Sequence, residues 1–161
     1  MKIKIFTTGG SIDKIYSTRL SNFIVGEPQV GGILEQANVA FDYEVESLMK
    51  KDSLELTESD RRLVFEKVSS ATEHNIMITH GTDTMINTAL LLLDVPDKVI
   101  VLTGAMQPAA FKYSDAPINI GSAAAALQIL PDGVYIAMNG RIYDPRRARK
   151  NVLLNRFEET N

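Results

Sequence analysis

The chain has 161 residues, a length typical of one domain that buries about two-thirds of its unfolded surface. Its 45% hydrophobic and 23% charged residues are typical of a globular protein, and a net charge of -3 argues against general nucleic-acid binding. The absence of cysteine excludes disulfides and thiolate chemistry, and two histidines are too few for a histidine metal site. No apolar run approaches the about 18 residues of a membrane span. We expect a soluble, cytoplasmic protein with small-molecule or protein partners, no membrane or nucleic-acid partner, and no signal peptide.

The first half of the chain alternates strand patterns with helix patterns. A β-branched and aromatic run ends at two glycines, and Thr57 followed by Asp60 is typical of a helix N-cap. In chain order, the sequence predicts a strand at 2–7, a loop at 8–11, a helix at 27–37, a strand at 39–48 and a helix from 58 to about 72.

The second half repeats this alternation. The sequence predicts a strand at 76–79, a helix at 85–93 capped by Thr82 or Asp83, a strand at 98–102, a helix at 118–130 and a strand at 134–138. Asn139-Gly140 predicts a hairpin turn into 141–143. Strands that alternate with helices indicate an α/β domain with a mostly parallel sheet. Ligands bind beyond the carboxyl ends of such strands, so we expect loops 8–11, 80–84 and 104–108 to converge.

Thr8-Gly9-Gly10-Ser11 places hydroxyls beside two glycines at a strand end. Glycines let backbone N–H groups approach a ligand and polarise a carbonyl oxygen, but the same residues also form plain tight turns. The segment lacks the glycine spacing and the lysine of a phosphate-binding loop, which leaves little support for a nucleotide-binding domain.

The segment His80 to Thr84 places hydroxyls and a carboxylate at the start of a predicted helix. Thr82 or Asp83 either caps that helix, or binds a substrate amine and activates a nucleophile with the help of a lysine. His80 alone is more typical of a hydrogen-bonded loop histidine than of a general base.

Five basic residues lie between Arg141 and Lys150. Such a run is typical of a solvated face or of a patch that pairs with the acidic Glu158-Glu159 segment. A nucleic-acid patch is disfavoured because no aromatic residue beyond Tyr143 accompanies the charges.

Taken together, four motifs resemble the N-terminal domain of the bacterial-type L-asparaginases. That family shows T-G-G-T-I, H-G-T-D-T, G-A-M-R-P and a lysine after the last strand. In this sequence the corresponding residues are Thr8 to Ile12, His80 to Thr84, Gly104 to Pro108, and Lys150. The resemblance implies a three-layer α/β fold with a Rossmann/flavodoxin-like sheet and a C-terminal hairpin. It also implies an amidohydrolase without metal or cofactor, which converts L-asparagine to aspartate and ammonia through a covalent acyl-enzyme.

The resemblance also assigns roles to single residues. Ser11 stands where the family has its nucleophilic threonine, while Thr82, Asp83 and Lys150 match a second group in which the threonine activates water or attacks. Asp83 would bind the substrate α-amine and Ser53 its α-carboxylate. The remaining substrate contacts implied are Gly10, Gly81 and the Ala105 carbonyl.

The family's tyrosine and two binding residues differ here. Tyr16 is the candidate that helps to activate the nucleophile, because Phe23 stands where longer members have the hydroxyl. Leu54 replaces a glutamine next to Ser53, and Gln107 replaces an arginine.

Full-length members of the family carry a second domain that completes the active site of a neighbouring subunit. We expect residues 1–161 to form a single N-terminal-type domain, with the C-terminal domain absent and the site completed in a homodimer or homotetramer. The alternative function is a weak or silent asparaginase-like domain that binds aspartate, asparagine or a protein partner.

Overall fold

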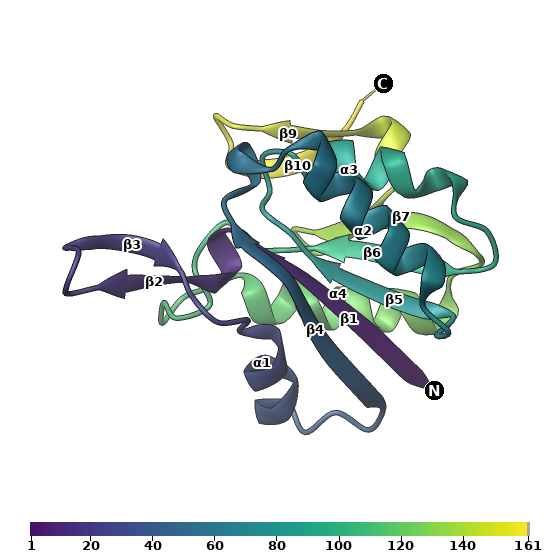
Figure 1. Cartoon of the computed structure of the whole chain (residues 1–161), viewed down its shortest axis with the longest axis horizontal. Helices are drawn as coiled ribbons and strands as arrows, with labels where there is room; N and C mark the ends of the chain where they lie inside the picture. Colours follow the sequence, from purple (N-terminus) through teal and green to yellow (C-terminus); the bar gives the residue numbers. More distant parts are fainter. Residues whose placement is uncertain (161) are drawn as a thin grey trace.

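A six-stranded sheet runs through the centre of the computed structural model, which describes residues 1–160 (Figure 1). Its strand order is β4 (Asp42–Lys51), β1 (Lys2–Gly9), β5 (Asn75–Thr79), β6 (Val99–Thr103), β7 (Gly133–Met138) and β8 (Arg141–Tyr143). The first five strands are parallel, and β8 pairs antiparallel with β7. The five parallel strands follow a flavodoxin-like order: β4 lies on one side of β1, and β5, β6 and β7 follow on the other side.

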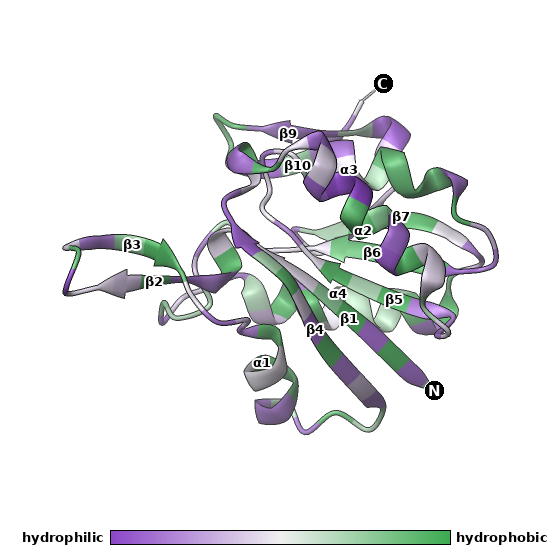
Figure 2. Cartoon of the chain, viewed as in Figure 1, coloured by the Kyte–Doolittle hydropathy of each residue, from purple (hydrophilic) through white to green (hydrophobic). Residues whose placement is uncertain are grey.

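Helices cover both faces of the sheet. Helices α1 (Val30–Gln36) and α4 (Ala116–Ile129) pack with one apolar cluster, while α2 (Glu58–Ser70) and α3 (Met85–Leu91) pack with another. All five residues of β6 are buried, as is usual for a parallel strand covered on both faces, and Figure 2 shows this strand as largely hydrophobic. The predicted three-layer α/β fold is therefore confirmed.

Two small hairpins were not predicted from the sequence. Strand β2 (Lys14–Ser17) pairs with β3 (Asn22–Val25), and β9 (Ala148–Asn151) pairs with β10 (Arg156–Glu159). Each strand has four residues and mixes polar with apolar side chains, so no clear alternation marks it. The β2–β3 hairpin extends away from the sheet in Figure 1.

Several predicted boundaries were shifted. Helix α1 starts at Val30 rather than at 27, β4 runs from Asp42 to Lys51, and α3 ends at Leu91 before a short 3-10 turn. The Asn139-Gly140 turn is confirmed: both residues have positive φ, at 54° and 73°, as a two-residue hairpin turn requires. Within residues 1–160, no helix has both the length and the apolar character needed to cross a membrane.

The predicted cap of α2 is confirmed in detail. Thr57 Oγ1 accepts a hydrogen bond from Asp60 N at 3.2 Å, and Asp60 Oδ2 accepts one from Thr57 N at 2.9 Å. We predict that Thr57→Ala lowers the free energy of unfolding by about 1 kcal/mol, because the Asp60 N–H loses the side-chain oxygen that accepts its hydrogen bond. Urea denaturation would measure this change. Ser59→Ala, an exposed change in the same first turn, should stay within about 0.5 kcal/mol of the parent; equal effects of the two substitutions would contradict the prediction.

Candidate active site

The candidate site lies where the strand order changes direction. The chain leaves β1 to reach β4 on one side and later returns to β5 on the other, so the loops after β1 and β5 face each other. This change of direction is where ligands bind in open α/β sheets. Ser11 follows β1 at this point, and Thr82 follows β5.

Two glycines bring these loops into contact. Gly10 has a φ of 86°, and a Cβ atom on it would lie 2.4 Å from the Cα of Gly81. A Cβ atom on Gly81 would lie 2.5 Å from the Cβ of Ser53. Because no larger residue fits at either position, the two glycines set the distance between the Ser11 turn, the loop after β5 and the Ser53 turn.

The loop after β6 meets the same turn. Ala109 N donates to Ile12 O at 3.0 Å, and this loop also contains Ala105, which is 1% exposed. The loop is shaped by Asp115, whose carboxylate accepts hydrogen bonds from Met106 N and Gln107 N at 2.9 Å each. The three predicted loops thus converge. Asp115 was missed by sequence reasoning, although an acidic residue just before a helix start is a detectable signal.

Lys150 joins the loop after β5 from the far end of the sequence. Its Nζ donates to Thr82 Oγ1 at 2.8 Å and to Asp83 Oδ1 at 2.6 Å. Thr82 is 5% exposed, whereas the side chains of Lys150 and Asp83 are 17% and 41% exposed. The arrangement places a hydroxyl, an amine and a carboxylate within hydrogen-bond distance, as nucleophile or water activation needs.

These contacts overturn the predicted cap of α3. The N-cap of this helix is Thr84, not Thr82 or Asp83, and no side chain caps it. The oxygens of Thr82 and Asp83 bind Lys150 instead, while Thr84 Oγ1 donates to Ser53 O at 2.8 Å. The polar residues of this loop therefore hold other parts of the chain in place.

Ser53 is buried beside Gly81. It is 1% exposed, and its Oγ has no hydrogen-bond partner within residues 1–160. A buried hydroxyl without a partner is costly, so this oxygen is suited to receive a polar ligand atom. Leu54, which follows it, is 73% exposed.

His80 is a structural residue, as its sequence context favoured. It is fully buried, with Nδ1 2.7 Å from Gly81 O and Nε2 2.8 Å from Thr88 Oγ1. Burial lowers the pKa of His80 to about 4, so its ring is neutral near pH 7. With both nitrogens engaged inside the protein, His80 does not serve as a base here.

Tyr16 lies on β2, apart from the Lys150 contacts. It is 55% exposed, faces Phe23 across the hairpin, and its ring centroid lies 5.5 Å from that of Phe23. Phe23 in turn packs against Phe111 at 5.7 Å. The Tyr16 hydroxyl makes no hydrogen bond within the described residues, so its role stays a prediction.

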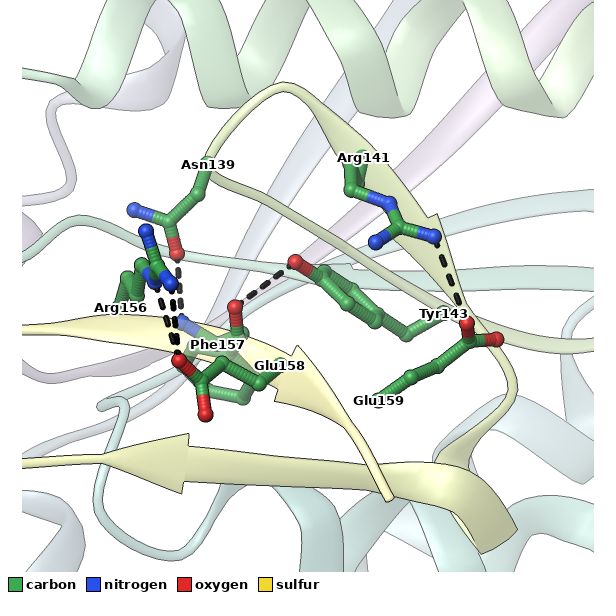
Figure 3. Close-up of a pocket in the computed structure, with 7 residues that line it drawn as sticks. All are labelled: Asn139, Arg141, Tyr143, Arg156, Phe157, Glu158 and Glu159. Atoms are coloured by element: carbon green, nitrogen blue, oxygen red, sulfur yellow. Dashed lines mark hydrogen bonds and ion pairs between the residues drawn. The ribbon is translucent and has the colours of Figure 1, made fainter. Parts of the chain in front are cut away.

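The basic run after β7 pairs with the acidic segment, as one interpretation of the sequence held. Arg141 contacts Glu159 at 3.4 Å, and Arg149 contacts Glu158 at 3.1 Å. A pocket of about 440 Å³ lies between β8 and β10, and its lining includes the ion pairs of Arg141 with Glu159 and of Arg156 with Glu158 (Figure 3). Within residues 1–160, no group of three or more histidine, aspartate or glutamate side chains is arranged to hold a metal ion.

Comparison with known proteins agrees with this geometry. The family model described as "Asparaginase, N-terminal" matches residues 2–156. A glutaminase-asparaginase of Acinetobacter glutaminasificans is 34% identical over 131 residues, covering 78% of this chain and 38% of that protein. L-asparaginase 2 of Escherichia coli is 31% identical over 159 residues, covering 92% of this chain and 46% of that protein.

Solved structures show the same relationship. The thermostable L-asparaginase of Thermococcus kodakarensis superposes with a TM-score of 0.87 at 28% identity, covering 99% of this chain and 51% of that one. A probable cytoplasmic L-asparaginase of Campylobacter jejuni superposes with a TM-score of 0.83 at 27% identity, covering 98% of this chain and 52% of that one. The fold is thus that of an asparaginase N-terminal α/β domain. The chain belongs to the asparaginase family, and it spans about half the length of the relatives it matches.

One acidic residue next to the Ser11 turn has an unusual environment. Asp13 is 1% exposed, and its carboxylate accepts one hydrogen bond, from Gln29 N at 2.9 Å. Burial raises the pKa of Asp13 from 3.8 to about 7, opposed by this hydrogen bond; the nearby charges are Glu27 and Lys50. The native state therefore binds a proton that the unfolded chain releases near pH 4, so this group makes stability fall as pH rises from about 4 to about 7.

We predict that Asp13→Asn removes this pH dependence. The gain in unfolding free energy relative to the parent should grow between pH 4 and pH 8 to at most about 4 kcal/mol, because the amide has no charge to bury. Urea denaturation at several pH values measures it, with the exposed Asp42→Asn as the control. A constant difference between Asp13→Asn and the parent across this range would show that Asp13 ionises normally.

Proposed function

We propose that the chain is an L-asparaginase-type amidohydrolase, which hydrolyses L-asparagine to L-aspartate and ammonia. The observation that carries the proposal is the contact of Lys150 Nζ with Thr82 Oγ1 and Asp83 Oδ1, next to the glycine turn that holds Ser11. The family match and the relatives named as L-asparaginases support the same activity.

In the proposed mechanism, Ser11 Oγ attacks the side-chain carbonyl carbon of asparagine. The C–N bond breaks, the nitrogen takes up the serine proton and leaves as ammonia, and an ester links Ser11 to the aspartyl group. Thr82, with Lys150 beside it, then activates a water molecule that cleaves the ester and returns the proton to Ser11. Serine supplies the hydroxyl of the family's threonine but lacks the methyl group that restricts χ1.

The surrounding groups would hold the substrate by charge and hydrogen bonds. Asp83 receives the α-amine, and the unpartnered Ser53 Oγ receives the α-carboxylate. The Ala105 carbonyl faces the side-chain amide, and the backbone at Gly10 and Gly81 lines the closest approach to the substrate. Tyr16 helps to activate Ser11 if the hairpin brings its hydroxyl over the site.

We predict that purified protein releases ammonia from L-asparagine, and that Ser11→Ala, Thr82→Val and Lys150→Met each lower kcat by at least about 100-fold, the range for loss of an acid–base or nucleophilic group. A coupled ammonia assay measures this, and circular dichroism verifies folding. Thr72→Val, the same chemical change at an exposed position beyond α2, is the matched control and should retain activity. A folded protein that binds asparagine without hydrolysing it would contradict the proposal.

The roles of the Ser11 and Thr82 hydroxyls can be distinguished by trapping the covalent intermediate. If Ser11 is the nucleophile and Thr82 serves the water step, Thr82→Val should accumulate a covalent adduct on Ser11 after mixing with asparagine. Peptide mass spectrometry would show the added aspartyl group. An adduct on Thr82 in the Ser11→Ala variant would reverse the order of the two groups.

We further propose that residues 1–161 act as one N-terminal-type domain in a cytoplasmic homodimer or homotetramer. Support comes from solvent exposure at the site, where the Asp83 side chain is 41% exposed, because catalytic electrostatics weaken in water. One structural neighbour is named cytoplasmic and one relative periplasmic.

We predict a solution mass of two or four times 17.8 kDa by light scattering; active protein at the monomer mass would contradict this assembly.

A further inference from the structure

The β9–β10 hairpin, which carries Lys150, is held from its outer edge by side chains of the β7–β8 hairpin. Residues of an antiparallel pair of strands alternate between hydrogen-bonded and non-hydrogen-bonded positions. Thr160 N donates to Arg147 O at 2.7 Å, so these two residues occupy a hydrogen-bonded position. Phe157, three residues before Thr160, therefore occupies a position that is not hydrogen-bonded to β9, opposite Lys150. Its N–H and C=O point away from β9 and need other partners.

Two side chains supply those partners, as Figure 3 shows. Asn139 Oδ1 accepts from Phe157 N at 2.8 Å, and the Tyr143 hydroxyl donates to Phe157 O at 2.8 Å. Together they bind both backbone groups of one residue, as a neighbouring strand would.

Both partners are themselves held in place. Tyr143 is 2% exposed, and burial raises its pKa, so its hydroxyl keeps the proton that it donates. Asn139 sits in the hairpin turn with a φ of 54°, and its N–H donates to Oδ1 of the buried Asn119 at 3.1 Å. Asn119 Nδ2 donates in turn to Gly104 O and to Asp115, so the contacts reach the loop that carries Ala105.

Phe157 transmits this fixed position to Lys150. Directly opposed residues of an antiparallel pair place their side chains on the same face and in close contact at such positions. Phe157 is 2% exposed and packs in the apolar cluster beneath α2 and α3, so its ring anchors the hairpin while the Lys150 amine reaches Thr82.

We propose that Asn139 and Tyr143 are positioning residues for Lys150, acting through the backbone of Phe157. The inference rests on the proposed hydrolase function for its kinetic consequences, but not for its structural ones. Loss of either bond lets β10 shift, and the Lys150 amine then leaves its place between Thr82 and Asp83.

The substitutions that test it remove single atoms or keep the backbone geometry. Tyr143→Phe removes one hydroxyl, and Asn139→Gly removes the acceptor while tolerating the positive φ. Asn139→Asp keeps an acceptor oxygen and serves as the rescue variant. Tyr135→Phe, which removes a hydroxyl bonded to Pro131 O at the other end of β7, is the matched control.

We expect Tyr143→Phe and Asn139→Gly each to lower kcat for asparagine by about 10-fold to 100-fold, as displacement of a catalytic group by about 1 Å does, with KM within about two-fold. Asn139→Asp and Tyr135→Phe should stay near the parent. Amide exchange of Phe157 in the native state should speed up by about 10-fold in Asn139→Gly, the effect of one lost hydrogen bond.

The outcomes separate the two proposals. If the parent does not hydrolyse asparagine, the hydrolase function fails, and the inference is still decided by Phe157 exchange and by the rate at which formaldehyde and a borohydride methylate Lys150. Faster methylation in both variants, with unfolding midpoints close to that of Tyr135→Phe, supports positioning. Unchanged exchange and methylation, or a kcat equal to that of the control, would overturn it.

Discussion

The contact between Lys150 and the Thr82-Asp83 pair is the interaction on which the candidate site depends. It joins residues almost 70 positions apart, at distances of 2.8 and 2.6 Å, and so connects the last hairpin to the loop at the centre of the sheet. Because Thr82 is 5% exposed, its hydroxyl binds the amine away from most of the solvent, where hydrogen bonds to charged groups are stronger. The same contact explains why neither Thr82 nor Asp83 caps α3: their oxygens are engaged by the lysine.

A second constraint comes from backbone packing rather than charge. Gly10 and Gly81 lie so close that a Cβ atom on either would overlap its neighbour, and this places Ser11, Ser53 and Thr82 around one point. The strand order makes the approach possible, because loops after β1 and β5 leave the sheet where the chain changes direction. Asp115 then orders the loop after β6 by accepting two backbone N–H groups. Thr82 and Asp83 are thus held both by the loop that follows β5 and by contacts from Lys150, which comes from a distant segment.

Most of the fold could be predicted because its signals are local. Buried strands such as β6 appear as short apolar runs, and the capping box of Thr57 and Asp60 and the Asn139-Gly140 turn can be recognised from a few residues. The hairpins β2–β3 and β9–β10 could not, because pairing across four-residue strands of mixed polarity leaves no periodicity. The predicted cap of α3 was wrong for a related reason. Whether the Thr82 hydroxyl binds the start of its helix or Lys150 depends on a contact with a distant part of the chain, which local sequence does not show. The environment of Asp13 could not be predicted either, since the main cause of its raised pKa is burial in the folded chain.

The geometry of Asp83 shows how one carboxylate can serve both Lys150 and a substrate. Its Oδ1 accepts a hydrogen bond from Lys150 Nζ, whereas Oδ2 has no hydrogen bond within the described residues. The Asp83 side chain is 41% exposed. The exposed oxygen is open to a second cation, such as the α-amine of an amino acid, without loss of the first contact. Thr82 offers no such freedom, because it is buried under the lysine. In the proposed hydrolase, substrate binding and hydroxyl activation therefore share one ion pair: the solvent-facing oxygen is proposed to bind the substrate, and the contact with Lys150 to support the chemistry.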